Sequence, residues 1–458
     1  MSLTIPSGHA LETRRQSKAA PAIGQSARAP GAVQPGAIQP GAIQPGAIQP
    51  GAIQPGAIQP GAAPAARSIS MFAAIACVVL VALDLRPGIV SLGPLLPRLI
   101  AQFGLSHLQA SLLTAIPTLL MGLLALPAPW LAHRFGRDRV ILAALAVLAG
   151  ASLARAFASS SAFLFLTTVG VGAGIALAGA LIAGFVKGNY PKQAAILMGV
   201  YATAIALGST LSAAATGAIA AAVEGWRVGA GIWAVPGVIA FGAWLVIERR
   251  APKLQHGGAP KRRYNMPVNN STAWLIALFF ACNNFVFYAF ISWIAPMYVE
   301  YGRDAAHASL LLAGFTFSFM VANPVFGFLS RNEDRRTPLT ISAAIALAGT
   351  VAMAISPTAF PFLTVALIAF GTGGSFTLAM TLPLDNAANA DEANSWNAFV
   401  LLVSYVIAAA GPLLVGQIRD ASGSFHPALW MIAAVGVVML GATPFMQPHH
   451  HKKPRPAG

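Results

Sequence analysis

The sequence predicts an all-α membrane protein with twelve transmembrane helices arranged as two pseudo-symmetric six-helix bundles. The chain of 458 residues is 56% hydrophobic and only 9% charged, with a mean hydropathy of +0.68, whereas a soluble domain carries about 25% charged residues. Its apolar segments are about 18 residues long or longer, which is enough to cross a bilayer. The net charge of +15 comes from basic residues in short segments between these spans. That distribution is typical of membrane topology and argues against nucleic-acid binding.

The first 67 residues differ in composition from the rest of the chain. The pentapeptide QPGAI recurs from about Gln34 to Ala62, and the segment is rich in Pro, Gly, Gln and Ala. A segment with so few large apolar side chains cannot bury enough surface to fold. It also lacks the apolar core of a cleaved signal peptide. We therefore expect residues 1–67 to form a disordered, low-complexity cytoplasmic tail.

Two groups of six apolar spans follow the tail. An N-terminal bundle is expected over residues 68–247, with spans at 69–99, 108–131, 138–157, 161–186, 193–222 and 227–247. A C-terminal bundle is expected over residues 271–446, with spans at 271–300, 307–330, 337–356, 359–384, 394–418 and 425–446. Length and apolar content predict a helix for each span. The basic stretches 248–270 and 447–458 are expected to be a cytoplasmic linker and a cytoplasmic tail.

The distribution of Lys and Arg predicts the orientation of the chain. If the N-terminal tail is inside, the inner segments hold 22 of the 28 Lys and Arg residues, and Arg86 lies within the membrane. The outer loops hold the other five, which are Arg98, Arg155, Arg227, Arg303 and Arg419. Loops rich in Lys and Arg stay on the cytoplasmic side of a membrane. The excess therefore predicts that both termini are cytoplasmic.

Arg86 is a candidate site residue because it lies deep inside the first span. It follows the start of the apolar segment by about 18 residues, or roughly 27 Å of helix. A charge at that depth must face protein or a water-filled cavity. Pro87 and Gly88 follow, so the helix should kink or unwind, and broken helices carry the midplane sites of transporters. The guanidinium is suited to the anionic end of a substrate, although a permanent structural role is the alternative.

Further candidates share the apolar spans with Arg86. Asp84, two residues earlier, would be a counter-charge or a proton carrier. In the seventh span Asn283 and Asn284 need polar partners, and Asn284 shares a helix face with Tyr288. Trp293 could close over a substrate or belong to the aromatic belt. The remaining candidates are Thr372 and Phe376 in the tenth span and Tyr201 in the fifth.

Two loops at equivalent points of the halves carry similar charges. The first, PWLAHRFGRDRV (129–140), resembles the loop motif G-x-x-x-D-R-x-G-R-R of the major facilitator superfamily. The matching residues are Arg134, Gly136, Arg137 and Arg139, while Pro129 and His133 replace the family's glycine and aspartate. The second loop, FGFLSRNEDRRTPL (326–339), keeps Gly327, Asp334, Arg335 and Arg336. The resemblance implies gating roles for Arg134, Arg137, Asp334 and Arg335, in addition to the effect of their charges on orientation.

Four blocks resemble a narrower family, the cyanate permeases and 2-nitroimidazole exporters. They are LDLRPGIVSLGPLLPRL (83–99), LLTAIPTLLMG (112–122), YAFISWIAPMYVEYG (288–302) and GTGGSFTLAMTLPLD (371–385), which resemble helices 1, 2, 7 and 10. The resemblance implies the major facilitator fold, a site formed mainly by helices 1, 2, 5, 7 and 10, and a gate at Phe376. It also implies a bacterial inner-membrane location. Asp84 stands where the family commonly has asparagine.

The motifs of other chemistries are missing from the sequence. It contains no G-x-S-x-G elbow, H-E-x-x-H pair, nucleotide-binding lysine loop or paired intramembrane carboxylates, so we expect neither an enzyme nor a cofactor. Cys77 and Cys282 lie inside spans and suggest neither a disulfide nor a metal site. The expected partners are a small-molecule substrate and the lipid bilayer, with protons as a candidate coupling ion and no nucleic acid. A monomer is expected.

Three functions are compatible with these features. The first is secondary transport of a small anion or compact organic acid such as cyanate by alternating access, with Arg86 as the anchor. The second is export of a neutral heteroaromatic compound such as a nitroimidazole, conferring resistance, with Tyr288 and Phe376 stacking on the ring. The third is a transporter-like membrane sensor that signals through its long tail.

Overall fold

The computed structural model describes residues 71–446, apart from the short stretches 191–192, 251–265, 331–333 and 388–389. Contacts divide the chain into Met1–Gly61 and Ala62–Gly458, and every described residue belongs to the second unit. The expected disordered tail, the basic C-terminal tail and most of the expected linker lie outside the described residues. The predicted domain boundaries stay a prediction.

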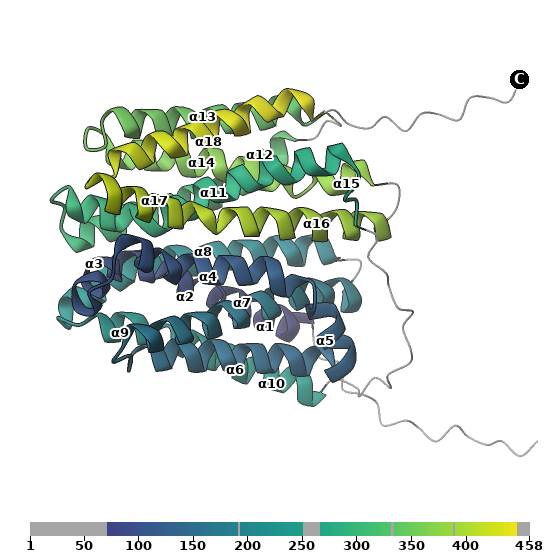
Figure 1. Ribbon diagram of the computed structural model, residues 1–458. Helices are drawn as coiled ribbons and strands as arrows, with labels where there is room; N and C mark the ends of the chain where they lie inside the picture. Colours follow the sequence, from purple (N-terminus) through teal and green to yellow (C-terminus); the bar gives the residue numbers. More distant parts are fainter. Residues whose placement is uncertain (1–70, 191–192, 251–265, 331–333, 388–389, 447–458) are drawn as a thin grey trace, which may run out of the picture. The chain divides into compact units, whose positions relative to one another are not determined.

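The N-terminal half consists of helices α1 to α10 (Figure 1). Several predicted spans are built from two or three consecutive helices, because a proline or glycine interrupts the hydrogen bonding of the backbone. The helices are α1 (Met71–Asp84), α2 (Pro87–Val90), α3 (Leu92–Phe103), α4 (His107–Ala125), α5 (Ala128–Phe135), α6 (Arg137–Arg155), α7 (Ser161–Asn189), α8 (Ala194–Ala222), α9 (Trp226–Gly231) and α10 (Ala234–Arg250).

The C-terminal half repeats this arrangement from α11 onward. Its elements are α11 (Ser271–Glu300), α12 (Ala305–Leu329), α13 (Arg336–Ile355), α14 (Pro361–Ala379), α15 (Leu382–Asn386), α16 (Ala390–Ala408), α17 (Ala410–Ser422), α18 (His426–Ala442) and the short 3₁₀ helix η2 (Thr443–Phe445). Among the described residues there is no β-strand. The predicted helical fold class is confirmed.

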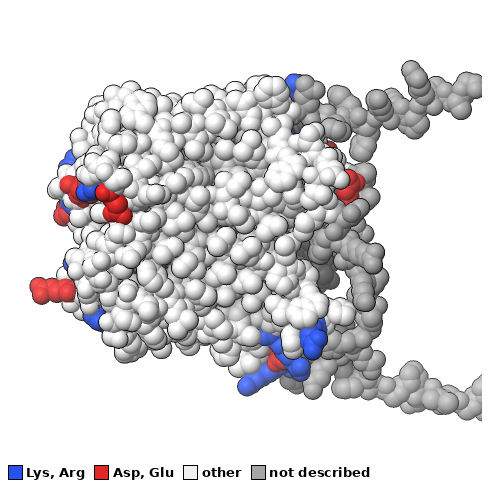
Figure 2. Space-filling model, viewed as in Figure 1, with Lys and Arg blue, Asp and Glu red and all other residues white. Residues whose placement is uncertain are grey.

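Eleven helical segments of the described chain are long and apolar enough to cross a membrane. The twelfth expected span corresponds to α6, which fails that test because Arg137, Asp138 and Arg139 open it and Arg155 ends it. α6 nevertheless packs along α7 and α10 as the other spans pack along their neighbours. Figure 2 shows why the membrane assignment holds, since the charged side chains gather at the two ends of the helices and the middle of this face is uncharged.

The halves meet where α8 packs on α12 and where α4 packs on both α16 and α17, and α3 also packs on α11. Small residues allow the backbones to approach closely. A Cβ atom at Gly217 of α8 would lie 1.8 Å from the Ser309 Oγ of α12. A Cβ atom at Gly416 of α17 would lie 2.5 Å from the His107 carbonyl oxygen of α4. Any larger residue at either position would force the halves apart.

The helical bundle has two ends. The terminal face is the end at which α1 begins and α18 ends, and it contains α5 and α15 (Figure 1). The opposite face contains the turns after α3, α11 and α17. Helices α3 and α17 both end there at glycines with left-handed backbone, Gly104 at φ 60° and Gly423 at φ 70°, a conformation that glycine adopts without strain.

Candidate functional site

The first transmembrane span is interrupted at Arg86, as the sequence predicts. Helix α1 ends at Asp84 and α2 begins at Pro87, which has no N–H to continue the helix. The Arg86 carbonyl instead accepts hydrogen bonds from the amides of both Ile89 and Val90, each at 3.0 Å. Such a break is tolerated at membrane depth only inside protein or beside a cavity. The backbone therefore presents the Arg86 side chain toward the other half.

The Arg86 guanidinium is hydrogen-bonded to a tyrosine hydroxyl. Its Nη1 donates to the Tyr288 hydroxyl oxygen of α11 at 2.6 Å, and its Cζ lies 5.7 Å from the centroid of the same ring. Tyr201 and Tyr405 also interact electrostatically with the guanidinium. Among the described residues no carboxylate lies within 4.0 Å of it. A permanently charged group thus lies between the halves without an ion-pair partner in the described part of the chain.

Arg86 borders a cavity of about 110 Å³ between the two halves. Its walls come from the broken first span and from α8, α11, α12 and α14. The lining residues are Arg86, Ala202, Ile205, Ala206, Ser209, Asn284, Phe287, Tyr288, Thr316, Phe319, Asn323 and Phe376. The N-terminal half contributes the cation and mainly small or apolar residues, and the C-terminal half contributes aromatic and polar side chains.

Four of the predicted binding residues come together in this cavity: Arg86, Asn284, Tyr288 and Phe376. The Asn284 Nδ2 donates to the Ser404 Oγ at 2.7 Å, which satisfies part of this buried amide. The Phe376 ring lies 5.6 Å from that of Phe319, measured between centroids. The amide is thus partly used within the C-terminal half, whereas the ring is positioned as a wall.

The other four predicted binding residues lie elsewhere. Asp84 is 3% exposed and its Oδ1 points at Gly237 of α10, so it faces the interior of the N-terminal half and does not line the cavity. Asn283 is fully buried, and neither side-chain polar atom has a partner among the described residues. Thr372 bonds to carbonyls of its own helix. Tyr201 is buried near Arg86 but is not a lining residue.

The sequence predicts that the fifth span, which is α8, contributes to the site, but the lining residues of α8 and the whole wall formed by α12 were not predicted. Thr316, Phe319 and Asn323 of α12 follow the spacing i, i+3, i+7, which places them on one helix face. The Asn323 Oδ1 accepts a hydrogen bond from the Thr377 Oγ1 at 2.9 Å. These three residues could have been recognised in the sequence, because an asparagine follows a threonine and a phenylalanine on the same helix face of an apolar span. Ala202, Ile205 and Ala206 of α8 gave no such signal, because small apolar residues fill lipid-facing surfaces equally well.

The two predicted gating loops differ in their ion pairs. In the N-terminal loop Arg137 approaches its neighbour Asp138 at 3.4 Å and its Cζ lies 4.9 Å from the Phe185 ring centroid. Arg134 has aromatic neighbours and, among the described residues, no carboxylate partner. No carboxylate lock to the C-terminal half is present among the described residues of this loop, where His133 replaces the family's aspartate.

The C-terminal loop carries two Arg–Asp pairs. Arg335 binds Asp385 of α15 through two nitrogens, one of them at 3.2 Å, and so ties the loop to the tenth span. Asp334 accepts from the Arg336 Nη2 at 2.6 Å and from the Arg336 backbone N–H at 3.0 Å. The hydrogen bonds from Arg336 lower the pKa of the Asp334 carboxyl to about 2. Asp385 was not singled out in the sequence, because its partner is 50 residues away.

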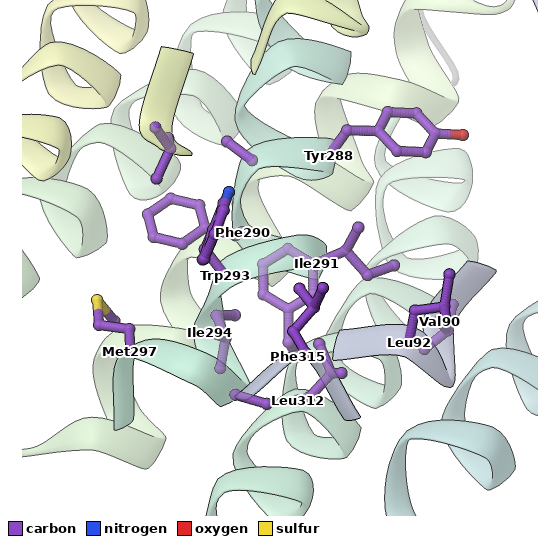
Figure 3. Packing of buried hydrophobic residues seen from close by; sticks show 14 of the residues in the cluster. Val90, Leu92, Tyr288, Phe290, Ile291, Trp293, Ile294, Met297, Leu312 and Phe315 are labelled. Atoms are coloured by element: carbon purple, nitrogen blue, oxygen red, sulfur yellow. The ribbon is translucent and has the colours of Figure 1, made fainter. Parts of the chain in front are cut away.

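Trp293 lies away from the cavity, at the opposite face. Figure 3 shows Tyr288 and Trp293 on different sides of α11. The Trp293 Nε1 donates to the Pro412 carbonyl at 3.0 Å, and its ring packs 5.7 Å from that of His107. His107 in turn pairs with Asp420 of the C-terminal half at 2.7 Å. Trp293 therefore belongs to a cluster that joins the halves at this face.

Within the described chain, the hydrogen bonds that join a side chain of one half to the other half lie in two places. Arg86 with Tyr288 and Tyr288 with Met121 lie at the cavity. His107 and the Leu108 amide with Asp420, and Ser111 with the Pro412 carbonyl, lie at the opposite face. The opposite face is thus the end of the bundle at which side-chain hydrogen bonds join the two halves.

Arg155 requires a correction to the predicted loop charges. It is the last residue of α6 but only 1% exposed, so it is not a loop arginine. Its Nη1 donates to the Gly88 carbonyl at 2.8 Å, and its Nη2 lies 3.4 Å from the Thr168 Oγ1. Packing of α6 against the broken first span turns this side chain inward, which the position of a residue at a span end cannot reveal.

The described part of the chain contains no candidate metal-binding site. No group of three His, Cys, Asp or Glu residues there could hold an ion. Cys77 and Cys282 are both free thiols.

The comparisons with known proteins agree with this geometry. The model of the Major Facilitator Superfamily matches residues 70–412 and again 295–458. The cyanate transport protein CynX of Escherichia coli (strain K12) is 29% identical over 76% of this chain and 90% of its own length. The 2-nitroimidazole transporter of the same organism is 28% identical over 80% of this chain and 92% of its own. A crystal structure of a bacterial homologue of the lysosomal transporter Spinster, in an inward-facing and unoccupied conformation, superposes with a TM-score of 0.66 at 18% identity, covering 82% of this chain and 97% of that one.

The fold and the cavity between its halves define a multi-pass membrane transporter of small solutes and not an enzyme. The chain belongs to the Major Facilitator Superfamily.

Proposed function

We propose that this protein carries a small anion, such as cyanate or a compact organic acid, and that Arg86 anchors it. The observation that carries the proposal is the guanidinium at the cavity wall, which has a tyrosine hydroxyl as its partner and no carboxylate among the described residues. Opposite charges attract far more strongly in a low-dielectric interior than in water. The planar fork of donors suits a carboxylate or a similarly sized anion. The similarity to a cyanate transport protein supports the same class of solute.

The size of the cavity limits the solute. Its volume of about 110 Å³ is below the roughly 150 Å³ of an engineered apolar cavity that holds benzene. A solute with a handful of non-hydrogen atoms fits without rearrangement of the walls. A larger organic acid would require the two halves to separate.

The transport cycle in this proposal is alternating access. The halves rock around the Arg86 cavity, and the contacts of His107 and Ser111 with α17 break when the opposite face opens. We place both termini in the cytoplasm of a bacterium and the transporter in its inner membrane as a monomer. The orientation rests on the excess of Lys and Arg in the inner segments. Removing Arg155 from the five outer charges leaves four, which strengthens that excess.

Asp84 is the candidate for coupling transport to protons. Its carboxyl is 3% exposed and its Oδ2 has no hydrogen-bond partner among the described residues. A buried carboxyl without a partner is costly in its charged form, so it can take up and release a proton during the cycle. The variant Asp84→Asn should bind the solute with unchanged affinity but no longer accumulate it against a gradient when a pH difference is imposed on proteoliposomes. Full pH-driven accumulation by this variant would exclude Asp84 as the carrier.

A second candidate function is export of a neutral heteroaromatic compound. Phe287, Phe319, Phe376 and Tyr288 line one side of the cavity, and stacking on aromatic rings would hold a planar solute. The similarity to a 2-nitroimidazole transporter supports this alternative. In this reading Arg86 is structural, so the two functions make opposite predictions for its removal.

The deciding experiment measures thermal stability of the detergent-purified full chain with cyanate, formate, acetate and 2-nitroimidazole. A ligand present at 100 times its dissociation constant adds about 2.7 kcal/mol to the folded state. We expect one anion to stabilise the native protein and the Arg303→Ala control, but not Arg86→Ala. If 2-nitroimidazole alone stabilises all three, the exporter function replaces the anion proposal. Uptake of the stabilising solute by proteoliposomes then tests transport itself.

A further inference from the structure

A second hollow lies on the outside of the N-terminal half, near the terminal face. Its volume is about 600 Å³, and its lining comes from α5, α6 and α7. No lining residue belongs to the C-terminal half, so this groove is separate from the Arg86 cavity. Ala143 and Val147 are exposed on its floor, and Val147 is 46% exposed. In a membrane-spanning helix such exposure means contact with lipid.

The walls of the groove are apolar over the length of an acyl chain segment. Val140, Ala143 and Val147 follow the spacing i, i+3, i+7 and form one stripe along α6. From Arg139 to Val147 the stripe runs about 12 Å into the membrane. Ala173 and Leu177 of α7 form the facing wall. An acyl chain could lie in this groove along its whole depth.

The mouth of the groove is cationic. Arg134 and Arg139 both line it at the terminal face, where Figure 2 shows a group of Lys and Arg side chains. Arg139 shares an ion pair of 3.6 Å with Glu248, but 67% of its side chain remains exposed. Arg134 has no carboxylate partner among the described residues. Among the described residues, the charge of Arg134 at the mouth has no ion-pair partner.

Two aromatic rings lie beside the Arg134 guanidinium. The Arg134 Cζ lies 5.8 Å from the Trp130 ring centroid and 5.6 Å from that of Phe135. Both rings are at least half exposed, at 58% and 50%. Exposed tryptophan and phenylalanine beside arginine are typical of the membrane–water interface, where the apolar body and the charge meet different solvents.

We propose that this groove is a binding site for an anionic phospholipid of the phosphatidylglycerol type. The phosphate lies between Arg134 and Arg139, and one acyl chain lies along the stripe on α6. Charge complementarity at the mouth and the apolar depth below it select a lipid over a soluble anion, since a soluble anion would leave the apolar walls unoccupied. The site is independent of the transported solute.

The test is lipid binding to the detergent-purified full chain, measured by native mass spectrometry and by thermal stability. Phosphatidylglycerol is compared with phosphatidylcholine of the same acyl chains and with glycerol 3-phosphate as the soluble headgroup. Two matched pairs of variants locate the site. Arg134→Gln is paired with Arg303→Gln, an exposed arginine at the opposite face, and Ala143→Phe with Ala146→Phe, an exposed alanine of α6 that does not line the groove.

We expect phosphatidylglycerol to bind in preference to phosphatidylcholine. Arg134→Gln should weaken its binding roughly tenfold, the effect of one charge-assisted hydrogen bond, and Ala143→Phe should abolish it, while both control variants bind like the native protein. Three results would overturn the proposal: equal binding of the two lipids, equal occupancy by glycerol 3-phosphate, or full phosphatidylglycerol binding by both Arg134→Gln and Ala143→Phe.

Discussion

Arg86 is half-buried and Arg155 is buried, and these two arginines of the same half both contact or belong to the broken first span. Arg86 belongs to that span, and Arg155 donates to its Gly88 carbonyl. Neither has a carboxylate partner among the described residues. Arg86, however, faces a cavity and bonds to Tyr288 of the other half, whereas Arg155 is 1% exposed and bonds only within its own half.

The difference distinguishes an arginine at a binding site from an arginine that stabilises the fold. A buried cation must be compensated, and backbone carbonyls or hydroxyls can do this permanently, as they do for Arg155. Only a cation that borders free space, as Arg86 does, leaves room for an exchangeable anion. Burial of a charge in a membrane protein is therefore a weaker indication of function than the presence of a cavity beside it.

The comparison predicts opposite consequences for the two alanine variants. Arg155→Ala removes a charged donor from the Gly88 carbonyl and leaves a void, which should lower the free energy of unfolding by about 2–4 kcal/mol. Its affinity for the solute should change by less than about threefold in the protein that remains folded, because no new polar group enters the cavity. Arg86→Ala should do the reverse, with an affinity loss of about 100-fold and little loss of stability. Thermal unfolding and solute titration of both variants check this.

Arg155→Met is the control for volume. It fills most of the space but cannot donate, so it should fall between the native protein and Arg155→Ala in stability. A loss of solute binding in Arg155→Met with unchanged stability would contradict the assignment of Arg155 as an arginine that stabilises the fold.

Most of the fold could be predicted from the sequence, because a transmembrane helix is recognised by the length and hydropathy of its segment. The span 138–157 predicted from the sequence corresponds to α6, although the charged ends of α6 keep it below the apolar composition of the other spans, and its packing on α7 and α10 supports the assignment. The break at Arg86 was also predictable, since Pro87 cannot donate a backbone hydrogen bond. Both features follow from the residues of the segment itself.

The site was predictable only in part. Arg86, Asn284, Tyr288 and Phe376 are polar or aromatic residues in apolar spans, and all four line the cavity. Residues such as Ile205 could not be recognised, because an apolar side chain is compatible with lipid, with another helix and with a cavity alike. The inward turn of Arg155 depends on how α6 packs, which no local pattern encodes.

A smaller effect is expected from Tyr288→Phe, which sharpens the role of the Arg86 partner. The substitution keeps the ring but removes the hydroxyl that accepts from the Arg86 Nη1. The guanidinium then loses its fixed orientation, so solute affinity should fall about fivefold, the effect of a hydrogen bond worth roughly 1 kcal/mol. Tyr298→Phe is the matched control on the same helix, since its hydroxyl bonds to the Pro357 carbonyl far from the cavity. Equal losses of affinity in the two variants would show that any tyrosine hydroxyl on α11 acts through stability.

The smallest effect is expected at the C-terminal loop, where the Asp334–Arg336 pair is exposed. Hydrogen bonds from Arg336 lower the pKa of Asp334 to about 2, from an ordinary value of 3.8. A lowered folded-state pKa means that the stabilisation is fully present above pH 4 and is lost as the pH falls from 4 through 2. Because the pair is exposed, its contribution should be below about 1 kcal/mol. The stability difference between the native protein and Asp334→Asn should therefore be constant from pH 8 to 5 and shrink only below pH 4, and a difference that changed near neutral pH would assign the effect to another group.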